Sequence, residues 1–249
     1  MLENSSRHRK KWRIILLPAW VLAGFLIAQL IITGLAWVLI AAGLDRTLFE
    51  QAPVQALFMA SVYALAILIV ISLPLMLRKR RTTLKELGLQ ELPTWTDIIL
   101  APAGLVVYLA LSIALVFVAS SVIPWFDIIQ AQDVGFNNLI WRYEYILAFV
   151  ALVVLVPIAE EVLFRGYLYG KMRKVAPIWL SVILTSVLFG AVHGAWNLAV
   201  DMFALGVVLS LLREMTGRLW APILLHMLKN AIAFYLLFIN PAVSATLGT

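Results

Sequence analysis

Hydrophobic residues occur along this chain in seven long stretches, without the strict alternation that is typical of strands. A helix needs about 20 apolar residues to cross the hydrocarbon core of a bilayer, and most of these stretches reach that length. An open sheet cannot satisfy its backbone hydrogen bonds in lipid, so the pattern predicts helices. We expect them at 14–43, 54–77, 97–123, 144–166, 177–196, 198–212 and 219–240, of which the sixth is short.

The composition indicates a membrane protein. Hydrophobic residues make up 63% and charged residues 13% of the 249, and the mean hydropathy is +0.99. A water-soluble domain with a polar surface could not tolerate these values. The chain has no cysteine, which excludes disulfide and thiolate chemistry. The predicted fold class is therefore all-α, a polytopic transmembrane bundle of about seven helices, with eight as the alternative, in the plasma membrane.

The basic residues predict the orientation of the chain in the membrane. A net charge of +6 would also suit a nucleic-acid-binding protein, but the charges lie in short clusters at the ends of apolar stretches. We therefore expect the lipid bilayer as a partner and no nucleic acid. If the helices alternate, Arg46 and Arg142 lie on one side and the basic clusters on the other, which places the N-terminus in the cytoplasm. These clusters lie within 7–13, 78–85, 171–174 and 213–218.

The polar segment 82–96 lies between the second and third stretches. Its leucines and Trp95 alternate with polar residues. This composition predicts either a helix along the cytoplasmic interface or a plain polar loop.

Ionisable residues interrupt the fourth stretch at Glu160, Glu161 and Arg165. A charge near the bilayer centre costs about 2.5 to 3.5 kcal/mol, so this cluster needs internal partners or a water-filled cavity. Successive helical residues point about 100° apart, so the two glutamates cannot share one face. Glu161 and Arg165, in contrast, form an i, i+4 pair. Glu160 is left without a counter-ion, which suits a general base. The alternative is that all three charges only lock helices together.

Two histidines occur in later apolar stretches. His193 follows Phe189 by four residues, and Asn230 follows His226 by four, so each pair faces one direction on its helix. The third histidine, His8, belongs to the N-terminal basic cluster. The placement of His193 and His226 inside membrane stretches favours a function over simple core packing.

These residues carry a family resemblance. Residues 160–165 resemble the EExxxR motif, residues 189–193 the FxxxH motif and residues 226–230 the HxxxN motif of the CPBP family. These intramembrane proteases are named for CAAX and bacteriocin processing, and the family is also called Abi. The resemblance covers about residues 144–240. We therefore divide the chain into N-terminal membrane helices (1–143), a catalytic helical core (144–240) and a short tail (241–249).

The resemblance implies a membrane endopeptidase that acts on a membrane-associated peptide, either of the prenylated CAAX type or of a leader or bacteriocin type. Glu160, helped by His193, would activate a water molecule, and His226 and Asn230 would stabilise the oxyanion. Glu161, Arg165 and Phe189 would support the site. The alternative function is a non-proteolytic scaffold, regulator or immunity protein. A proton-coupled transporter is disfavoured, because paired broken helices in two matching halves are absent from the sequence.

The sequence leaves the participation of a metal open. Glu160, His193 and His226 would make a two-histidine, one-carboxylate zinc set with a position free for water. No HExxH motif is present to decide. Metal-free chemistry is slightly favoured, because Asn230 is a poor zinc ligand and a good hydrogen-bond donor.

Two charged residues and the depth of the site complete the expectations. Lys229 and Asp201 either pair with each other, or Lys229 extends toward the interface while Asp201 lies near the outer surface. Lys229 could also attract an acidic group of a substrate.

To bring Glu160 and His193 together, the fourth helix should continue toward Lys174, and the turn near Gly194 should lie below the outer surface. The site should then open toward the cytoplasm.

Overall fold

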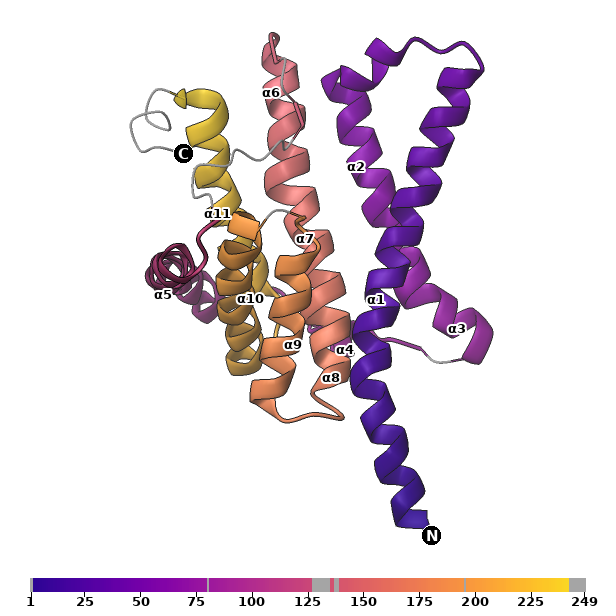
Figure 1. The fold of residues 1–249 in the computed structure, drawn as a ribbon, viewed down its shortest axis with the longest axis vertical. Coiled ribbons are helices and arrows are strands. Elements are labelled where there is room, and N and C mark those ends of the chain that lie inside the picture. Colours follow the sequence, from indigo (N-terminus) through magenta and orange to yellow (C-terminus); the bar gives the residue numbers. More distant parts are fainter. Residues whose placement is uncertain (1, 80, 127–134, 137–138, 195, 242–249) are drawn as a thin grey trace.

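The computed structural model of the protein describes residues 2–79, 81–126, 135–136, 139–194 and 196–241. In these ranges the regular structure is helical (Figure 1), which confirms the all-α fold class. Arg80 and most of the predicted tail lie outside the described residues. The segments are α1 (Leu2–Ala41), η1 (Arg46–Glu50), α2 (Ala52–Ile67), η2 (Leu68–Ser72), α3 (Leu73–Arg78), α4 (Leu84–Leu87), α5 (Trp95–Val122), α6 (Arg142–Phe149), η3 (Val150–Leu155), α7 (Val156–Glu161), η4 (Val162–Tyr169), α8 (Gly170–Met172), α9 (Ile178–Ala191), α10 (Trp196–Thr216), α11 (Trp220–Phe234) and η5 (Tyr235–Ile239).

Several of these segments join into continuous helices. Segments α6 to α8 form one helix from Arg142 to Met172, and α2 to α3 form another. Each contains a proline, Pro157 or Pro74, two residues after the end of a π-helical segment. Proline has no backbone N–H, so the wider π turn lets the helix continue where an ordinary hydrogen bond is lost. This helix ends at Met172, six residues beyond the predicted end at residue 166. We expected such an extension toward Lys174, because it helps to bring Glu160 and His193 to the same depth.

Five helices in the described ranges are long and apolar enough to cross a membrane. They are Trp12–Ala41, Ala52–Leu77, Trp95–Val122, Arg142–Met172 and Trp220–Ile239. The predicted fifth span is the 14-residue α9, which is only about 21 Å long and cannot cross alone. The predicted sixth span is the longer α10. Figure 1 shows the adjoining ends of α9 and α10 at middle height in the bundle.

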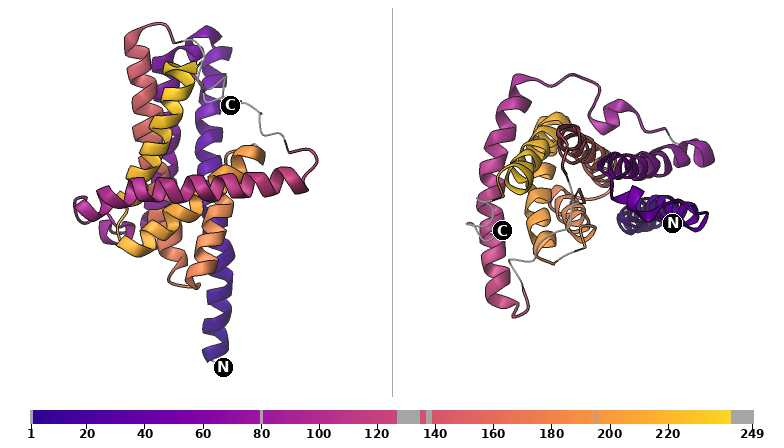
Figure 2. Two further views of the ribbon diagram at one scale, coloured as in Figure 1. Left: turned by 90° about the vertical axis from the view of Figure 1, so that its left-hand side faces the viewer. Right: turned by 90° about the horizontal axis from the view of Figure 1, so that it is seen from above.

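The third long helix, α5, is arranged differently from the others. Figure 2 shows it lying across the bundle, in a direction different from that of α1, and it packs on α10 and α11. Gly104 allows this close packing, since a Cβ there would lie 3.0 Å from Leu212 and 3.1 Å from Leu225. Simple alternation of vertical spans, which the orientation argument assumed, therefore does not describe α5.

The basic residues collect at one end of the bundle. Figure 1 places α3, α4 and α8 toward the N-terminal end, and the α1–α2 connection and the start of α6 at the opposite end. Arg173 pairs with Glu214 at 2.9 Å at the N-terminal end, and Arg218 pairs with Glu91 at 3.0 Å. Arg46 and Arg142 begin η1 and α6 at the opposite end. The structure thus reproduces the charge asymmetry that the sequence predicted.

The segment 82–96 is attached to this basic end. Thr83 and Glu86 form a capping box on the short helix α4, and Glu86 forms ion pairs with Lys171 at 3.4 Å and Lys174 at 2.5 Å. The hydrogen bond from Lys174 holds the pKa of Glu86 below its usual value, so Glu86 is ionised at neutral pH. Leu87 is buried against the bundle. The segment is therefore neither a free loop nor a long interfacial helix.

Candidate active site

The helix Arg142–Met172 carries three buried ionisable side chains at its centre. Arg165 Nη1 donates to Glu161 Oε1 at 2.8 Å, and both side chains are fully buried. The ion pair predicted from the i, i+4 spacing is therefore present. The guanidinium of Arg165 also lies over the ring of Phe189, 4.1 Å from its centroid. A buried pair of this kind is costly to break, because the remaining partner becomes an uncompensated charge.

His226 of α11 lies between the two glutamates. Its Nδ1 is 3.0 Å from Glu161 Oε1, and its Nε2 is 3.7 Å from Glu160 Oε2. The 100° offset between the glutamates does not separate their surroundings, because one imidazole ring is wide enough to face both. Glu160 therefore forms no ion pair with Lys or Arg among the described residues, but His226 faces it as well as Glu161.

Glu160 also has a partner that the sequence did not reveal. Tyr63 of α2 donates a hydrogen bond from its hydroxyl to Glu160 Oε1. The only signal in the sequence was a tyrosine in the middle of an apolar stretch, since tyrosines of membrane helices are enriched at the two interfaces. The N-terminal helices therefore contribute to the site and do not only surround it.

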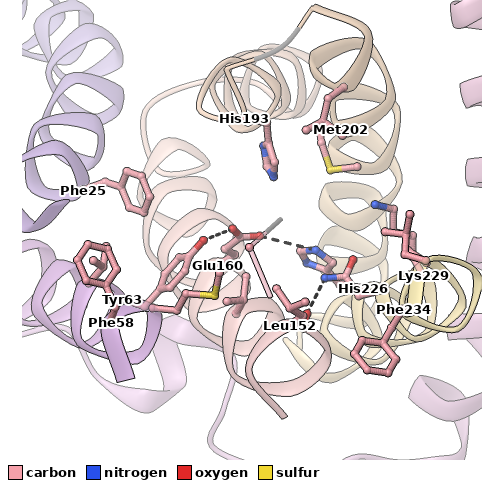
Figure 3. Close-up of a pocket in the computed structure, with 18 of the residues that line it drawn as sticks. Phe25, Phe58, Tyr63, Leu152, Glu160, His193, Met202, His226, Lys229 and Phe234 are labelled. Atoms are coloured by element: carbon pink, nitrogen blue, oxygen red, sulfur yellow. Dashed lines mark hydrogen bonds and ion pairs between the residues drawn. The ribbon is translucent and has the colours of Figure 1, made fainter. Parts of the chain in front are cut away.

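His193 faces Glu160 from the turn after α9. Its Nδ1 lies 2.7 Å from the carbonyl oxygen of Phe189, which orients the ring so that Nε2 points into the space above Glu160 and His226 (Figure 3). Gly190 makes this position possible, since a Cβ there would lie 2.5 Å from the carbonyl oxygen of Ala199 on α10. The close approach of α9 and α10 thus holds His193 over the glutamate.

Asn230 lies one turn beyond His226 on α11. Its Nδ2 donates to the carbonyl oxygen of Leu152 at 2.8 Å. Leu152 belongs to the π segment η3, so this contact fastens α11 to the helix that carries the glutamates. The amide nitrogen has a second hydrogen that this contact does not use.

The predicted site residues border one cavity of about 500 Å³ (Figure 3). Glu160, His193, His226 and Asn230 line it, whereas Glu161, Arg165 and Phe189 lie behind this wall and are fully buried. Most of the remaining lining is apolar, with aromatic side chains on several helices. The apolar lining includes Phe25, Phe58, Met59, Val62, Leu152, Val156, Leu198, Met202, Phe234, Leu237 and Phe238.

The cavity extends away from the basic end of the bundle. Phe58 precedes Tyr63 on α2, and Phe234 follows His226 on α11, so both aromatic residues lie on the side of the α1–α2 connection. Toward the basic end, the helix beyond Glu160 is packed and buried through Tyr169. Among the described residues, the lining of the cavity thus extends from Glu160 away from the basic end, and not toward it as expected.

A second cavity of about 500 Å³ adjoins the first. The two share Phe58, Met59 and Gly135 in their linings. The second continues along α1 and η1 to Arg46 and Glu50. Together the two cavities extend from Glu160 toward the end where α1 and α2 are joined.

Lys229 and Asp201 do not form the predicted ion pair. Asp201 Oδ1 accepts hydrogen bonds from Tyr108, at 2.7 Å, and Ser112, both on α5. This contact explains the charge in the middle of α10: it joins α10 to α5. Lys229 lines the cavity.

The three candidate zinc ligands have other contacts in this arrangement. Glu160 already accepts from Tyr63, His226 Nδ1 faces Glu161, and His193 forms no ion pair with Glu160. Among the described residues, no three His, Asp or Glu side chains are grouped so that they could hold a metal ion. We therefore assign no step of the chemistry to a metal.

Comparison with known proteins places this site in a family segment. Residues 142–232 match the family model "Type II CAAX prenyl endopeptidase Rce1-like". An uncharacterized 24.3 kDa protein of Escherichia coli is 36% identical in a region that covers 34% of this chain and 41% of the relative. YpbD of Bacillus subtilis is 29% identical in a region that covers 51% of this chain and 66% of the relative. The membrane-embedded CAAX protease MroQ of Staphylococcus aureus is 28% identical in a region that covers 34% of this chain and 37% of the relative.

The matches cover less than two thirds of the length of each of these relatives. No solved structure matches the chain. The glutamates, His193, His226 and Asn230 all fall inside the matched segment. This segment is thus similar to the Rce1-like CAAX protease family, in agreement with the resemblance that the three motifs carry.

Proposed function

We propose that this protein is an intramembrane endopeptidase in which Glu160 activates a water molecule. The observation that carries the proposal is the position of Glu160, which lines a cavity between membrane helices with His193 and His226 on the same wall. The Rce1-like segment and the relative named as a CAAX protease support it.

In the proposed reaction, Glu160 takes a proton from water while the hydroxide attacks the carbonyl carbon of the peptide bond. His193 Nε2 holds that water over the carboxylate. The tetrahedral intermediate then collapses with cleavage of the C–N bond, and Glu160 passes its proton to the leaving amine and becomes a carboxylate again. The amine takes up the remaining proton of the new carboxylic acid, so the products leave as a carboxylate and an ammonium. Tyr63 positions the carboxylate through its hydrogen bond.

The oxyanion needs donors beside Glu160. The gap of 3.7 Å between His226 Nε2 and Glu160 Oε2 is too long for a direct hydrogen bond and leaves Nε2 available to a substrate oxygen. Nδ1 lies 3.0 Å from Glu161 Oε1, so Nε2 is the ring nitrogen left to donate to the oxyanion. The second amide hydrogen of Asn230 supplies another donor. One such donor contributes about 2.7 to 4 kcal/mol to transition-state stabilisation.

The apolar cavity favours a membrane-associated peptide as substrate, of the prenylated CAAX type or the leader or bacteriocin type. We place the protein in the plasma membrane with the basic end in the cytoplasm. The two cavities then extend toward Arg46, away from the cytoplasm, which favours a peptide that enters through the bilayer or from the far side.

The metal-free assignment has its own test. Purified protein would be assayed for bound zinc and for activity before and after removal of the metal with a chelator. We expect activity without stoichiometric zinc. Stoichiometric zinc whose removal abolishes activity, and whose return restores it, would replace this proposal with a metalloprotease.

The function is tested by comparing peptide termini in the membranes of cells that carry the wild type, Glu160→Gln or His193→Ala. We expect one or more termini that appear only with the wild type, because both variants lose water activation. The same cells carry a Glu91→Gln control, whose altered side chain lies outside the cavity. Termini that stay unchanged in both site variants, while a cellular phenotype persists, would favour a scaffold or immunity protein.

Replacing Tyr63 with phenylalanine removes only the hydroxyl that donates to Glu160. A hydrogen bond to a charged group contributes about 1.5 to 3 kcal/mol, so we expect kcat to fall about tenfold or more with little change in KM. The measurement is steady-state cleavage by purified protein in vesicles. The control is Tyr235→Phe, at an exposed tyrosine of η5, and equal rates for the two variants would refute a role of Tyr63 in positioning.

A further inference from the structure

Lys229 is the one charged residue of the cavity without a partner among the described residues. Of the titratable side chains that line the cavity, Tyr63, Glu160, His193 and His226 each form a hydrogen bond or an ion pair. Lys229 forms neither. Figure 3 shows its amino group beside the cavity, on the same helix as His226. An ammonium in so apolar a space is unfavourable unless an anion or water meets it.

The nearest candidate anion on α10 does not meet this need. Asp201 forms no ion pair with Lys229, and its Oδ1 is directed at two hydroxyl groups of α5. Lys229 lies 11 residues beyond Arg218, about 16 Å along the helix. This depth makes extension of its side chain to the basic end of the bundle unfavourable. The ammonium is therefore available to a molecule inside the cavity.

The position of Lys229 relative to the reacting groups limits what that molecule is. Lys229 follows His226 by three residues, so their Cβ atoms lie about 5 to 6 Å apart. One residue of an extended peptide spans about 3.3 to 3.6 Å. A group that reaches Lys229 while the scissile carbonyl lies beside His226 must therefore belong to the peptide within about three residues of the cleaved bond.

We propose that Lys229 binds a carboxylate of the substrate and thereby selects peptides with an acidic group near the cleaved bond. This inference rests on the proposed function. The carboxylate is either the free C-terminus of the peptide or the side chain of Asp or Glu. In both cases the ammonium pairs with a carboxylate that arrives with the substrate. This explains why Lys229 forms no ion pair with the described residues of the substrate-free protein.

The test uses purified protein in phosphatidylcholine vesicles and a palmitoylated library of short apolar peptides with randomised central residues. The library is made in three forms: free acid, C-terminal amide, and amide with one glutamate. Product rates are measured by mass spectrometry. A charge-assisted contact predicts at least about a tenfold preference for one of the two acidic forms over the plain amide. Which acidic form is preferred identifies the source of the carboxylate.

The preference should disappear in Lys229→Met and persist in Lys229→Arg, which keeps the charge. Lys85→Met is the matched control, because Lys85 is exposed and does not line the cavity. A wild type without preference, or a Lys229→Met variant that keeps it, overturns the inference. So does a preference that is lost when phosphatidylglycerol is added to the phosphatidylcholine vesicles, since the ammonium would then bind a lipid headgroup.

Binding separates this inference from the proposed function. The same peptides, carrying a fluorophore, are titrated against Glu160→Gln and Glu160→Gln/Lys229→Met by fluorescence anisotropy. If the wild type cleaves no peptide but the single variant binds the acidic form at least about tenfold tighter, the proposed protease fails and the carboxylate site stands. If neither cleavage nor preferential binding is seen, both are overturned.

Discussion

Glu160→Gln is expected to lower kcat by about 100- to 10,000-fold without lowering the thermal stability of the protein. Glutamine has nearly the same shape and can still accept the hydrogen bond from Tyr63, but it cannot take a proton from water. Glu160 lines the cavity and is not the partner of Arg165, so its charge is not required to neutralise that guanidinium. The measurement combines single-turnover cleavage with a thermal unfolding curve in the same vesicles.

Glu161→Gln is the matched comparison for this variant. It makes the same chemical change one residue later, but it removes the charge that pairs with Arg165 and faces His226. We expect this variant to lose stability as well as activity. If Glu160→Gln retained more than about a tenth of the wild-type rate, below the range of general-base effects, another group would have to be the base.

Arg165→Met is expected to lower the free energy of unfolding by about 3 to 5 kcal/mol. Methionine replaces most of the apolar stem of arginine, but Glu161 then keeps its charge in a fully buried position without a cation. The contact of the guanidinium with Phe189 is lost as well. The measurement is reversible unfolding in mixed micelles of a mild detergent and dodecyl sulfate.

The double variant Glu161→Gln/Arg165→Met tests whether this loss comes from the unpaired charge. Removing both charges should recover a large part of the stability, because no uncompensated ion remains. Arg173→Met is a control at a more exposed pair at the end of the bundle, where a loss of only about 0 to 1 kcal/mol is expected. If the double variant is as unstable as Arg165→Met, the lost free energy of unfolding comes from packing and not from the unpaired charge.

The contacts that sequence reasoning could predict are those set by spacing on a single helix. Glu161 and Arg165 pair because residues four apart lie on the same side of a helix. The motif order also selected His193, His226 and Asn230, and the structure brings all three to the cavity with Glu160. Their catalytic roles remain predictions that the variants above test.

Contacts between separate helices could not be predicted in the same way. Tyr63 lies 97 residues before Glu160, and no spacing rule connects the two. The position of Asp201 depends on α5, which crosses the bundle and presents Tyr108 and Ser112 to α10. Apolar stretches predict that a helix forms, but they contain no information about the angle at which it packs.

The sequence by itself determined the helical class, the charge asymmetry between the two ends and the residues that the family motifs carry. Hydropathy and helical periodicity are local properties, so they can be derived without knowing the neighbours of each helix. Only the tertiary structure decided that Tyr63 meets Glu160, that His226 faces both glutamates and that the cavity leads away from the basic end. It also decided that Lys229 has no ion-pair partner among the described residues. These features depend on which side chains of distant helices fill the same space, and packing in three dimensions alone decides this.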